Sequence, residues 1–343
     1  MTVRGVLAVL ATAVSLTSGA TPAPLPTPSS TAPPERTVVV TTSDELVDAL
    51  DDATAGDTIA LSDGTYTGRF VAAAEGTEEA PITLTGARAA VLTTGSYSGG
   101  TALHITGGRW VVDGVSVTKS GRGIVLDGSK HTTIRDVEVG NVGAEGVRFR
   151  AGSSDGVLEG SDIHDTGVRT PASGDGVSIG SSFKNWKTVT GSGAKADRSD
   201  RVAVRDNTIT ATAGEGVDAK EGTTGGSVTG NTFRKAGFSG KNSADSWIDV
   251  KGNGYSVSGN SGSEALLDAI QVHSVRNGWG KKNAFADNTV LGGVAGFTVW
   301  VDEESPGTTV ACRDDADSGK DGDRGLSNLA CTAQPDPEQT GAK

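Results

Sequence analysis

Pairs of apolar residues one position apart recur along most of the chain, as expected for strands with one buried face. Successive side chains of a strand point to opposite faces, so the positions between the apolar residues point outward. The clearest copies share one five-residue pattern, at residues 216–220, 247–251 and 269–273. If these are neighbouring parallel strands about 4.8 Å apart, Lys220, Lys251 and His273 form one outward column beside Asp218 and Asp249.

The apolar pair returns at intervals of about 21 to 23 residues, or longer where a loop is inserted, which is typical of a solenoid. The aligned pairs are Ile82/Leu84, Leu103/Ile105, Ile124/Leu126, Val147/Phe149, Val177/Ile179, Val217/Ala219, Ile248/Val250, Ile270/Val272 and Phe297/Val299. A second strand is predicted after most of these, for example over residues 111–117. Asparagine recurs at one place in four of the second strands, as Asn207, Asn231, Asn260 and Asn288. We interpret it as a structural ladder, because Asn tolerates left-handed turns and can hydrogen-bond along a stack.

A capping helix is predicted ahead of the strands. Residues 42–45 read Thr-Ser-Asp-Glu, and the apolar positions that follow predict an N-capped amphipathic helix over residues 43–53. Such a helix would cover the open end of the first coil. The short strands, the repeat, the asparagines and the helix together predict an all-β fold, a single-stranded right-handed parallel β-helix with an N-terminal capping helix.

At this point the sequence resembles the secreted pectate-lyase-like right-handed β-helix proteins, over about residues 37–311. The phrases that carry the resemblance are the helix, Gly-Asp-Thr-Ile at 56–59 and Asp-Gly-Thr-Tyr at 63–66. The resemblance implies the pectin-lyase-like solenoid. It does not select one reaction, because one fold supports many functions.

The first residues predict export. Arg4 precedes an apolar run, and Ser18-Gly19-Ala20 fits the small-residue cleavage rule, so we predict a signal peptide over residues 1–20. A lipid-held N-terminal anchor is the alternative. No segment reaches the roughly 20 apolar residues of a membrane span. We therefore expect a secreted, extracellular protein, and we expect it to be a monomer.

Composition divides the rest of the chain. Residues 21–36 are rich in Pro, Ser and Thr and predict a linker, followed by the β-helix domain over 37–343 with a C-terminal loop region at 302–343. Cys312 and Cys331 are the only cysteines; in an exported protein they can close that loop as a disulfide, and free thiols are the alternative. The net charge of −12 disfavours nucleic acid as a partner.

The outward positions of the middle coils are polar and charged, as in a groove that binds an acidic sugar chain. Arg and Lys bind carboxylates, and Trp stacks on sugar rings. The longest insertion, residues 181–200, flanks the same coils, where binding residues concentrate. We predict that the substrate-binding residues are Arg148, Gln271, Trp186 and Trp300.

Lysines beside acids suit the eliminative cleavage of a uronate polymer. This reaction needs a base for the C5 proton, neutralisation of the adjacent carboxylate and a proton donor for the leaving oxygen. We predict Lys220 as the base, Lys251 or Arg150 as the neutralising cation and His273 as the donor. Nearby cations or Ca²⁺ could lower the pKa of the lysine. Candidate calcium ligands are Asp175, Asp197, Asp200, Glu215, Asp218 and Asp249.

Two phrases resemble the alginate lyase and chondroitinase B group of polysaccharide lyases: Glu-Gly-Val-Asp-Ala-Lys at 215–220, and Asp-Val-Lys-Gly-Asn at 249–253. In that group a Glu-x-Glu precedes the base Lys and an Arg lies on the next coil. Carried over, Glu215 matches the second acid and Lys220 the base. Ala213 stands where the first acid would be, and Lys251 replaces the Arg. Pectate lyases with a Lys base and a calcium pocket are a comparably loose resemblance.

Two other functions stay open. Residues 173–181 resemble the Gly-Asp-Asp and Ser-Ile-Gly-Ser phrases of polygalacturonase-type glycosidases, although Gly176 replaces the second Asp. In the alternative interpretation, the lysines form a charge ladder on an exposed sheet, which would suit a non-catalytic glycan-binding β-helix. The sequence favours a polysaccharide lyase that acts on an acidic polysaccharide.

Overall fold

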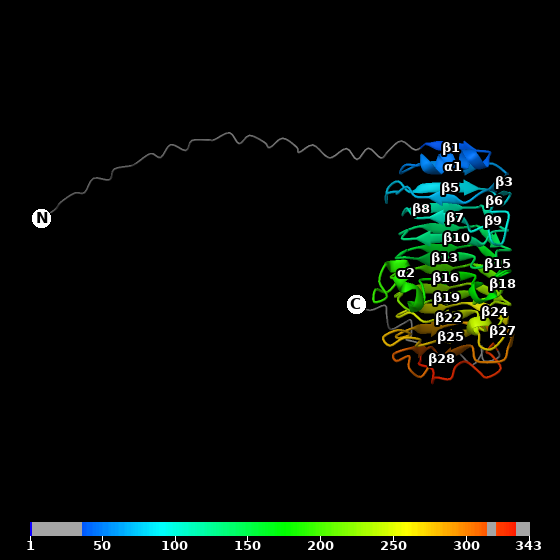
Figure 1. Cartoon of the computed structure of the whole chain (residues 1–343). Coiled ribbons are helices and arrows are strands. Elements are labelled where there is room, and N and C mark those ends of the chain that lie inside the picture. The colour runs from blue at the N-terminus through cyan, green and yellow to red at the C-terminus, as the bar shows by residue number, and fades with distance from the viewer. Residues whose placement is uncertain (2–35, 314–319, 334–343) are drawn as a thin grey trace. The chain divides into compact units, whose positions relative to one another are not determined.

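The computed structural model describes residues 1, 36–313 and 320–333. The predicted signal peptide and the linker lie outside these residues except for Met1 and Arg36, so both stay predictions. Within the described residues, the chain from Arg36 onward winds into a parallel β-helix (Figure 1). None of the described helices is long and apolar enough to cross a membrane.

The described strands form three parallel sheets, each named by its terminal strands. The β4–β28 sheet contains β4 (Phe70–Ala72), β7 (Thr101–Ile105), β10 (Arg122–Asp127), β13 (Val147–Arg150), β16 (Val177–Ile179), β19 (Val217–Ala219), β22 (Ile248–Val250), β25 (Ile270–Val272) and β28 (Val299–Val301). The β1–β29 sheet contains β1 (Thr37–Val40), β2 (Thr58–Leu61), β5 (Ile82–Gly86), β8 (Trp110–Asp113), β11 (Thr133–Arg135), β14 (Val157–Glu159), β17 (Ala203–Arg205), β20 (Ser227–Thr229), β23 (Ser256–Ser258), β26 (Ala284–Ala286) and β29 (Thr309–Val310). The β3–β27 sheet contains β3 (Gly64–Thr67), β6 (Ala90–Thr93), β9 (Ser116–Val117), β12 (Glu138–Gly140), β15 (Asp162–Thr166), β18 (Thr208–Thr212), β21 (Thr232–Arg234), β24 (Ser261–Ala265) and β27 (Thr289–Val294).

Each full coil therefore has three strands, where the sequence predicted two. The predicted strand over 111–117 is in fact β8 and β9, which belong to different sheets. Gly114 lies between them with φ of 80°, a left-handed conformation that turns the chain by a corner. The two-strand prediction was wrong because apolar alternation continues across this short turn.

The predicted apolar register holds in the middle of the stack and fails at both ends. Ile82 and Leu84 belong to β5 of the β1–β29 sheet, where Leu84 pairs with Ile59 and Ile82 pairs with Trp110. Strand β4 takes their predicted place beside β7. At the other end, Ile270 pairs with Val299 rather than with Phe297. Trp300 consequently pairs with Gln271, two residues out of the predicted register.

The asparagine ladder is confirmed. Each side-chain amide donates to the side-chain oxygen of the next asparagine, at 2.9 Å for Asn207 to Asn231, 3.0 Å for Asn231 to Asn260 and 2.9 Å for Asn260 to Asn288. All four are buried. The left-handed residue is the one before each asparagine, such as Gly230 with φ of 66°. The ladder satisfies buried backbone groups at the corner between the second and third strands.

The capping helix and the disulfide are present. Helix α1 spans Ser43–Asp51, two residues shorter than predicted, and Thr42 and Glu45 form a capping box at its start. Leu46, Ala49 and Leu50 are buried against the first coil. Cys312 and Cys331 form a disulfide across the C-terminal region.

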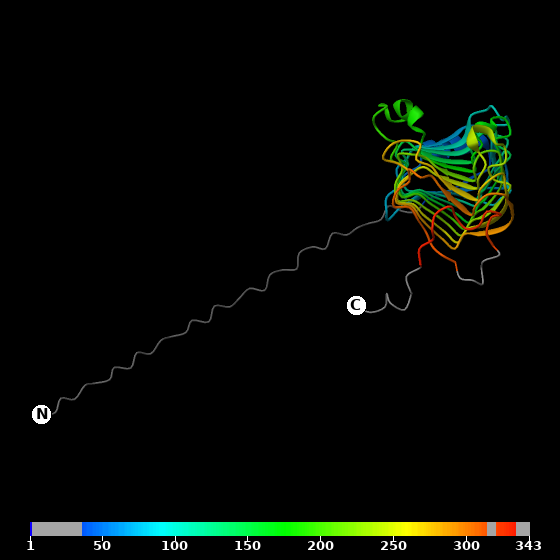
Figure 2. The same ribbon diagram turned by 90° about the horizontal axis from the view of Figure 1, so that it is seen from below.

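Two insertions rise on either side of the β4–β28 sheet, as the view along the stack shows (Figure 2). One carries η2 (Phe183–Asn185) and helix α2 (Trp186–Thr190), drawn in green. On the other side lie η1 (Pro171–Ser173) and η3 (Lys241–Ser243), which contact each other. The outward face of β19, β22 and β25 lies between these two walls.

Candidate active site

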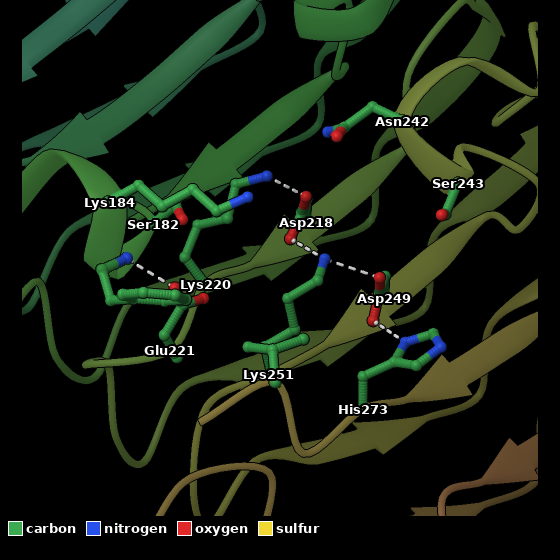
Figure 3. Close-up of a pocket in the computed structure, with 12 residues that line it drawn as sticks. Ser182, Lys184, Asp218, Lys220, Glu221, Asn242, Ser243, Asp249, Lys251 and His273 are labelled. Atoms are coloured by element: carbon green, nitrogen blue, oxygen red, sulfur yellow. Dashed lines mark hydrogen bonds and ion pairs between the residues drawn. The ribbon is translucent and has the colours of Figure 1, made fainter. Parts of the chain in front are cut away.

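A pocket of about 250 Å³ opens over β19, β22 and β25. Its floor consists of outward side chains from successive strands. The parallel pairing of β19 with β22 places Asp218 beside Asp249. Lys220, Lys251 and His273 follow directly after the three strands (Figure 3). The predicted column of two lysines and a histidine is thus found as one pocket floor.

Acidic and basic groups alternate along this floor. The Lys220 ammonium pairs with one oxygen of Asp218, and Lys251 Nζ lies 2.8 Å from the other. Lys251 Nζ also lies 2.5 Å from Asp249 Oδ2, and His273 Nδ1 lies 2.9 Å from Asp249 Oδ1. A single line of alternating charge therefore crosses three coils.

Both lysines are strongly held in the charged form. Burial lowers the pKa of the Lys220 ammonium, but the negative charges of Asp175, 3.5 Å away, and of Asp218 outweigh it and raise the pKa above its ordinary value. The pKa of Lys251 is raised well above its ordinary value, since Asp218 and Asp249 outweigh its burial. A neutral lysine therefore requires relief of the negative charge around it.

Asp249 and His273 stabilise each other's charged forms. Burial raises the pKa of the Asp249 carboxyl, but Lys251 and His273 outweigh it and hold that pKa below its usual range. The Asp249 carboxylate in turn outweighs the burial of His273 and raises the imidazole pKa. Within the described residues, His273 Nε2 has no hydrogen-bond partner. This nitrogen is free to give a proton to a bound molecule.

Three acids meet behind Lys220. One carboxylate oxygen from each of Asp175, Glu215 and Asp218 lies within 4.8 Å of the others, and all three residues are buried. Burial raises the pKa of Asp175, and burial together with Asp218 raises the pKa of Glu215 well above its ordinary value. With Asp249, four buried acids lie around the two lysines of the floor.

Solved structures resemble this chain over most of its length. The chain is similar to the alginate lyase from Paenibacillus sp. str. FPU-7, with 34% sequence identity, a TM-score of 0.76, and coverage of 87% of this chain and 97% of that one. The chain belongs to this family of polysaccharide lyases. The lyase also has the fold of pectate lyase Pel9A, at a TM-score of 0.54 and 14% identity over 78% of this chain and 72% of that one.

Sequence comparison shows the handedness of the β-helix. Residues 101–266 match the family described as "Right handed beta helix region", which confirms the predicted right-handed solenoid. The comparison with curated protein sequences gives no match. The resemblance to a pectate-lyase-like β-helix related to alginate lyases is confirmed.

Of the six predicted calcium ligands, three form the acidic cluster of the lyase and three have other partners. Asp249 lies between Lys251 and His273. Asp197 is fully buried and accepts hydrogen bonds from the backbone amides of Ala151 and Gly152, both at 3.0 Å. Asp200 pairs with Arg198 at 2.9 Å. These two aspartates hold the base of the α2 insertion.

The two predicted arginines lie outside the pocket lining. The Nε and Nη2 groups of Arg150 both donate to the Asp127 carboxylate, which also pairs with His104. Arg148 donates to Glu145 at 2.8 Å. Each arginine is thus already paired with a carboxylate on its own part of the β4–β28 sheet.

The remaining predicted binding residues have structural contacts. Gln271 is 3% exposed and donates its amide to two carboxylates. Trp186 is buried, donates to the Ser181 carbonyl at 2.9 Å and lies under the Arg276 guanidinium. Trp300 is partly exposed, and its ring centroid lies 5.1 Å from that of His273. Trp300 thus lies beside His273, and Gln271 is the cross-strand neighbour of Asp249.

The pocket walls come from residues that the sequence pattern did not identify. They are Ser182, Phe183, Lys184, Glu221, Asn242, Ser243 and Val275. Glu221 is buried and accepts a hydrogen bond from the Phe183 amide at 2.5 Å, which fixes the α2 wall against the floor. The only sequence signal for these walls was the added length of the two insertions.

Proposed function

We propose that this lyase cleaves a uronate-containing acidic polysaccharide by β-elimination, with Lys220 as the general base. The alternating line from Lys220 through Lys251 to His273 carries the proposal. It supplies a base, a cation and a proton donor side by side. The similarity to an alginate lyase supports the substrate class.

The uronate carboxylate is proposed to bind at Lys251, with Lys184 as a second cation on the pocket wall. Lys251 lies between the base and the donor, which is where the carboxylate next to the reacting carbon must lie. Neutralising this carboxylate acidifies the C5 proton, because the negative charge that develops on the acid group in the transition state is then stabilised. Arg150, already bound by Asp127, is the weaker candidate for this role.

Lys220 must be neutral when it reacts, and Asp175 is the proposed acceptor of its proton. Asp218 is shared between Lys220 and Lys251, whereas Asp175 is buried, has a raised pKa and lies 3.5 Å from Lys220 Nζ. A substrate that displaces water from the pocket disfavours the buried ion pair relative to the neutral pair. Transfer of one proton then leaves an amine and a carboxylic acid.

The elimination follows from these positions. The Lys220 amine takes the C5 proton, and the electrons of that bond form the C4–C5 double bond as the C4–oxygen bond breaks. His273 Nε2 donates its proton to the leaving oxygen. The products are an unsaturated uronate at a new chain end and an intact hydroxyl on the other fragment.

Calcium is proposed as an addition to this site. The cluster of Asp175, Glu215 and Asp218 fits Ca²⁺ in donor chemistry, because it offers hard carboxylate oxygens in a region short of positive charge. When bound there, the ion would supply positive charge that lowers the pKa of Lys220. A proton on Asp175 and a bound cation are alternative ways to compensate the same excess of negative charge.

Hydrolysis is the less favoured reaction for this floor. A glycosidase needs one carboxylic acid as proton donor and one carboxylate as base or nucleophile, both reaching the sugar. Here the floor carboxylates Asp218 and Asp249 are each bound by a lysine, and the pKa of Asp249 is lowered. Such groups are poor acids.

Secretion remains a proposal that rests on two observations. The N-terminal residues have the features of an export signal. The Cys312–Cys331 disulfide suits an oxidising compartment.

The test is incubation with pectate, alginate, glucuronan and glycosaminoglycans, followed by analysis of the new chain ends. Unsaturated uronate ends on at least one polymer support elimination. Saturated reducing ends would establish hydrolysis instead, and no cleavage of any uronate polymer would contradict the proposed substrate class.

A further inference from the structure

The pocket wall opposite Lys184 is formed by two residues of unusual backbone conformation. Asn242 and Ser243 have φ of 55° and 63°, both left-handed, in a loop that also includes Gly240 with φ of 63°. Left-handed backbone is unfavourable for residues with a side chain, and two in succession are rare. Such conformations persist only where the surroundings enforce them, and they gather at ligand-binding sites.

The side chains of these two residues face the floor. Figure 3 shows the Asn242 amide and the Ser243 hydroxyl beside Asp218 and Asp249, across the pocket from Ser182 and Lys184. Both residues are exposed, and neither side chain forms a hydrogen bond within the described residues. They present an amide and a hydroxyl, each able to donate and to accept, to whatever fills the pocket.

Gln271 holds this loop in place from below. Its amide nitrogen donates to Asp245 Oδ1 at 2.9 Å and to Asp268 Oδ2 at 3.0 Å. Asp268 is itself buried and accepts the Phe297 amide at 2.6 Å, so it is anchored to the next coil. Asp245 lies two residues after Ser243, and its carbonyl accepts the Leu267 amide at 3.0 Å. The glutamine therefore joins the loop end to two stacked coils.

Position 271 requires a hydrogen-bond donor, because two carboxylates face it. Burial, with the charges of Asp249 and Asp268, raises the pKa of Asp245, and the hydrogen bond from Gln271 opposes the rise. A donor between Asp245 and Asp268 allows two carboxylates to lie near each other. An apolar or acidic side chain at position 271 would leave them unpaired or repelling.

We propose that Asn242 and Ser243 bind the sugar hydroxyl groups of the substrate, and that Gln271 is the positioning residue that keeps their loop in the binding conformation. The inference rests on the proposed function and extends it to specificity. Cations on the floor and on the α2 wall bind the carboxylate edge of a uronate. The opposite wall, with paired donors and acceptors, suits its vicinal hydroxyl edge.

The substitutions Asn242→Ala and Ser243→Ala test the contact directly. Each removes one hydrogen-bonding group from an exposed loop, so each should lower kcat/KM by about three- to tenfold through KM, with kcat little changed. The wild type should discriminate against a polymer with acetylated hydroxyls, and the two variants should lose this discrimination. The matched control is Asn277→Ala, an exposed asparagine that does not line the pocket.

Gln271→Ala tests the positioning role. It should raise KM about tenfold. Adding Asn242→Ala to it should raise KM no further, because loss of Gln271 has already moved the Asn242 amide away from the substrate. The control Asn328→Ala removes an amide that bonds both backbone groups of Val301, so it should lower the melting temperature without changing KM. Effects of Gln271→Ala and Asn242→Ala that multiply, or an unchanged KM in Asn242→Ala and Ser243→Ala, would overturn the inference.

A binding measurement separates this inference from the proposed function. In the Lys220→Ala background, calorimetry with a uronate oligosaccharide should show binding that weakens about three- to tenfold on Asn242→Ala. If the wild type cleaves no uronate polymer and Asn242→Ala still weakens oligosaccharide binding, the proposed reaction is contradicted and the proposed role of the loop is supported. Equal binding with and without the Asn242 side chain would contradict the proposed binding role of the loop and leave the proposed reaction unaffected.

Discussion

Lys251 Nζ lies 2.8 Å from Asp218 Oδ1, across the boundary between two coils of the β-helix. Because the other oxygen of Asp218 pairs with Lys220, one carboxylate joins the two lysines of the pocket floor. This arrangement makes the two lysines unequal partners. Lys251 is bound by Asp218 and by Asp249, whose pKa is lowered, whereas Lys220 also lies near Asp175, whose pKa is raised.

Asp175→Asn is expected to remove the acceptor for the Lys220 proton. The kcat/KM of the variant should fall about 100-fold. In the wild type the rate should fall as the pH drops through the raised pKa of Asp175, because the acceptor is then already protonated. The variant should lack this acid limb. A pH profile with the same acid limb in the variant would contradict the role of Asp175.

Asp249→Asn is expected to shift the alkaline limb of the pH profile of kcat/KM. His273 must be protonated to act as donor, so the rate falls as the pH rises through its pKa. Asp249 raises that pKa above the ordinary value, and its loss lowers it. The decline in kcat/KM should therefore begin at lower pH than in the wild type.

The control for that profile is Asp113→Asn, which breaks an ion pair with Arg135 on the β1–β29 sheet. Its alkaline limb should match the wild type. A limb that stays fixed in Asp249→Asn would show that His273 is not the titrating donor.

Calcium binding is tested by metal removal. Treatment with EDTA should slow the reaction, and added Ca²⁺ should restore it. Ca²⁺ should also raise the melting temperature of the wild type but not of Glu215→Gln, which removes one carboxylate of the cluster. Unchanged rate and melting temperature would eliminate the ion and leave the roles of Lys220 and Asp175 unaffected.

The asparagine ladder predicts a stability effect without a change in chemistry. Asn231 is buried, receives hydrogen bonds from Asn207 and donates to Asn260 and the Val204 carbonyl. Its replacement by alanine leaves several buried groups unpaired and should cost about 3 kcal/mol of unfolding free energy. Urea denaturation measures this loss. The exposed Asn277→Ala should be near neutral, and an equal effect of both substitutions would contradict the ladder's role.

The sequence predicted the pocket floor because strand alternation is a local property. A two-residue period separates core from outward positions, so Lys220, Lys251 and His273 could be aligned without knowing the structure. The third strand of each coil was missed where turns such as that at Gly114 are too short to interrupt the apolar pattern.

The walls of the pocket could not be predicted in the same way. Insertions have no apolar period, so nothing in the chain placed Asn242 and Ser243 beside the floor. The same insertions explain why two predicted binding residues are buried: Gln271 bonds the end of the loop that carries Asn242 and Ser243, and Trp186 packs within the α2 insertion itself. Asp197 likewise binds loop backbone rather than the acidic cluster.

The most direct measurement is the rate at which Lys220→Ala forms unsaturated uronate ends, compared with the wild type and with Lys251→Ala. Loss of the base should lower kcat by about 10³-fold with little effect on oligosaccharide affinity. Loss of Lys251 should weaken affinity as well, because this lysine is proposed to bind the carboxylate. Activity in a folded Lys220→Ala that stays within tenfold of the wild type would contradict the assignment of Lys220 as the base.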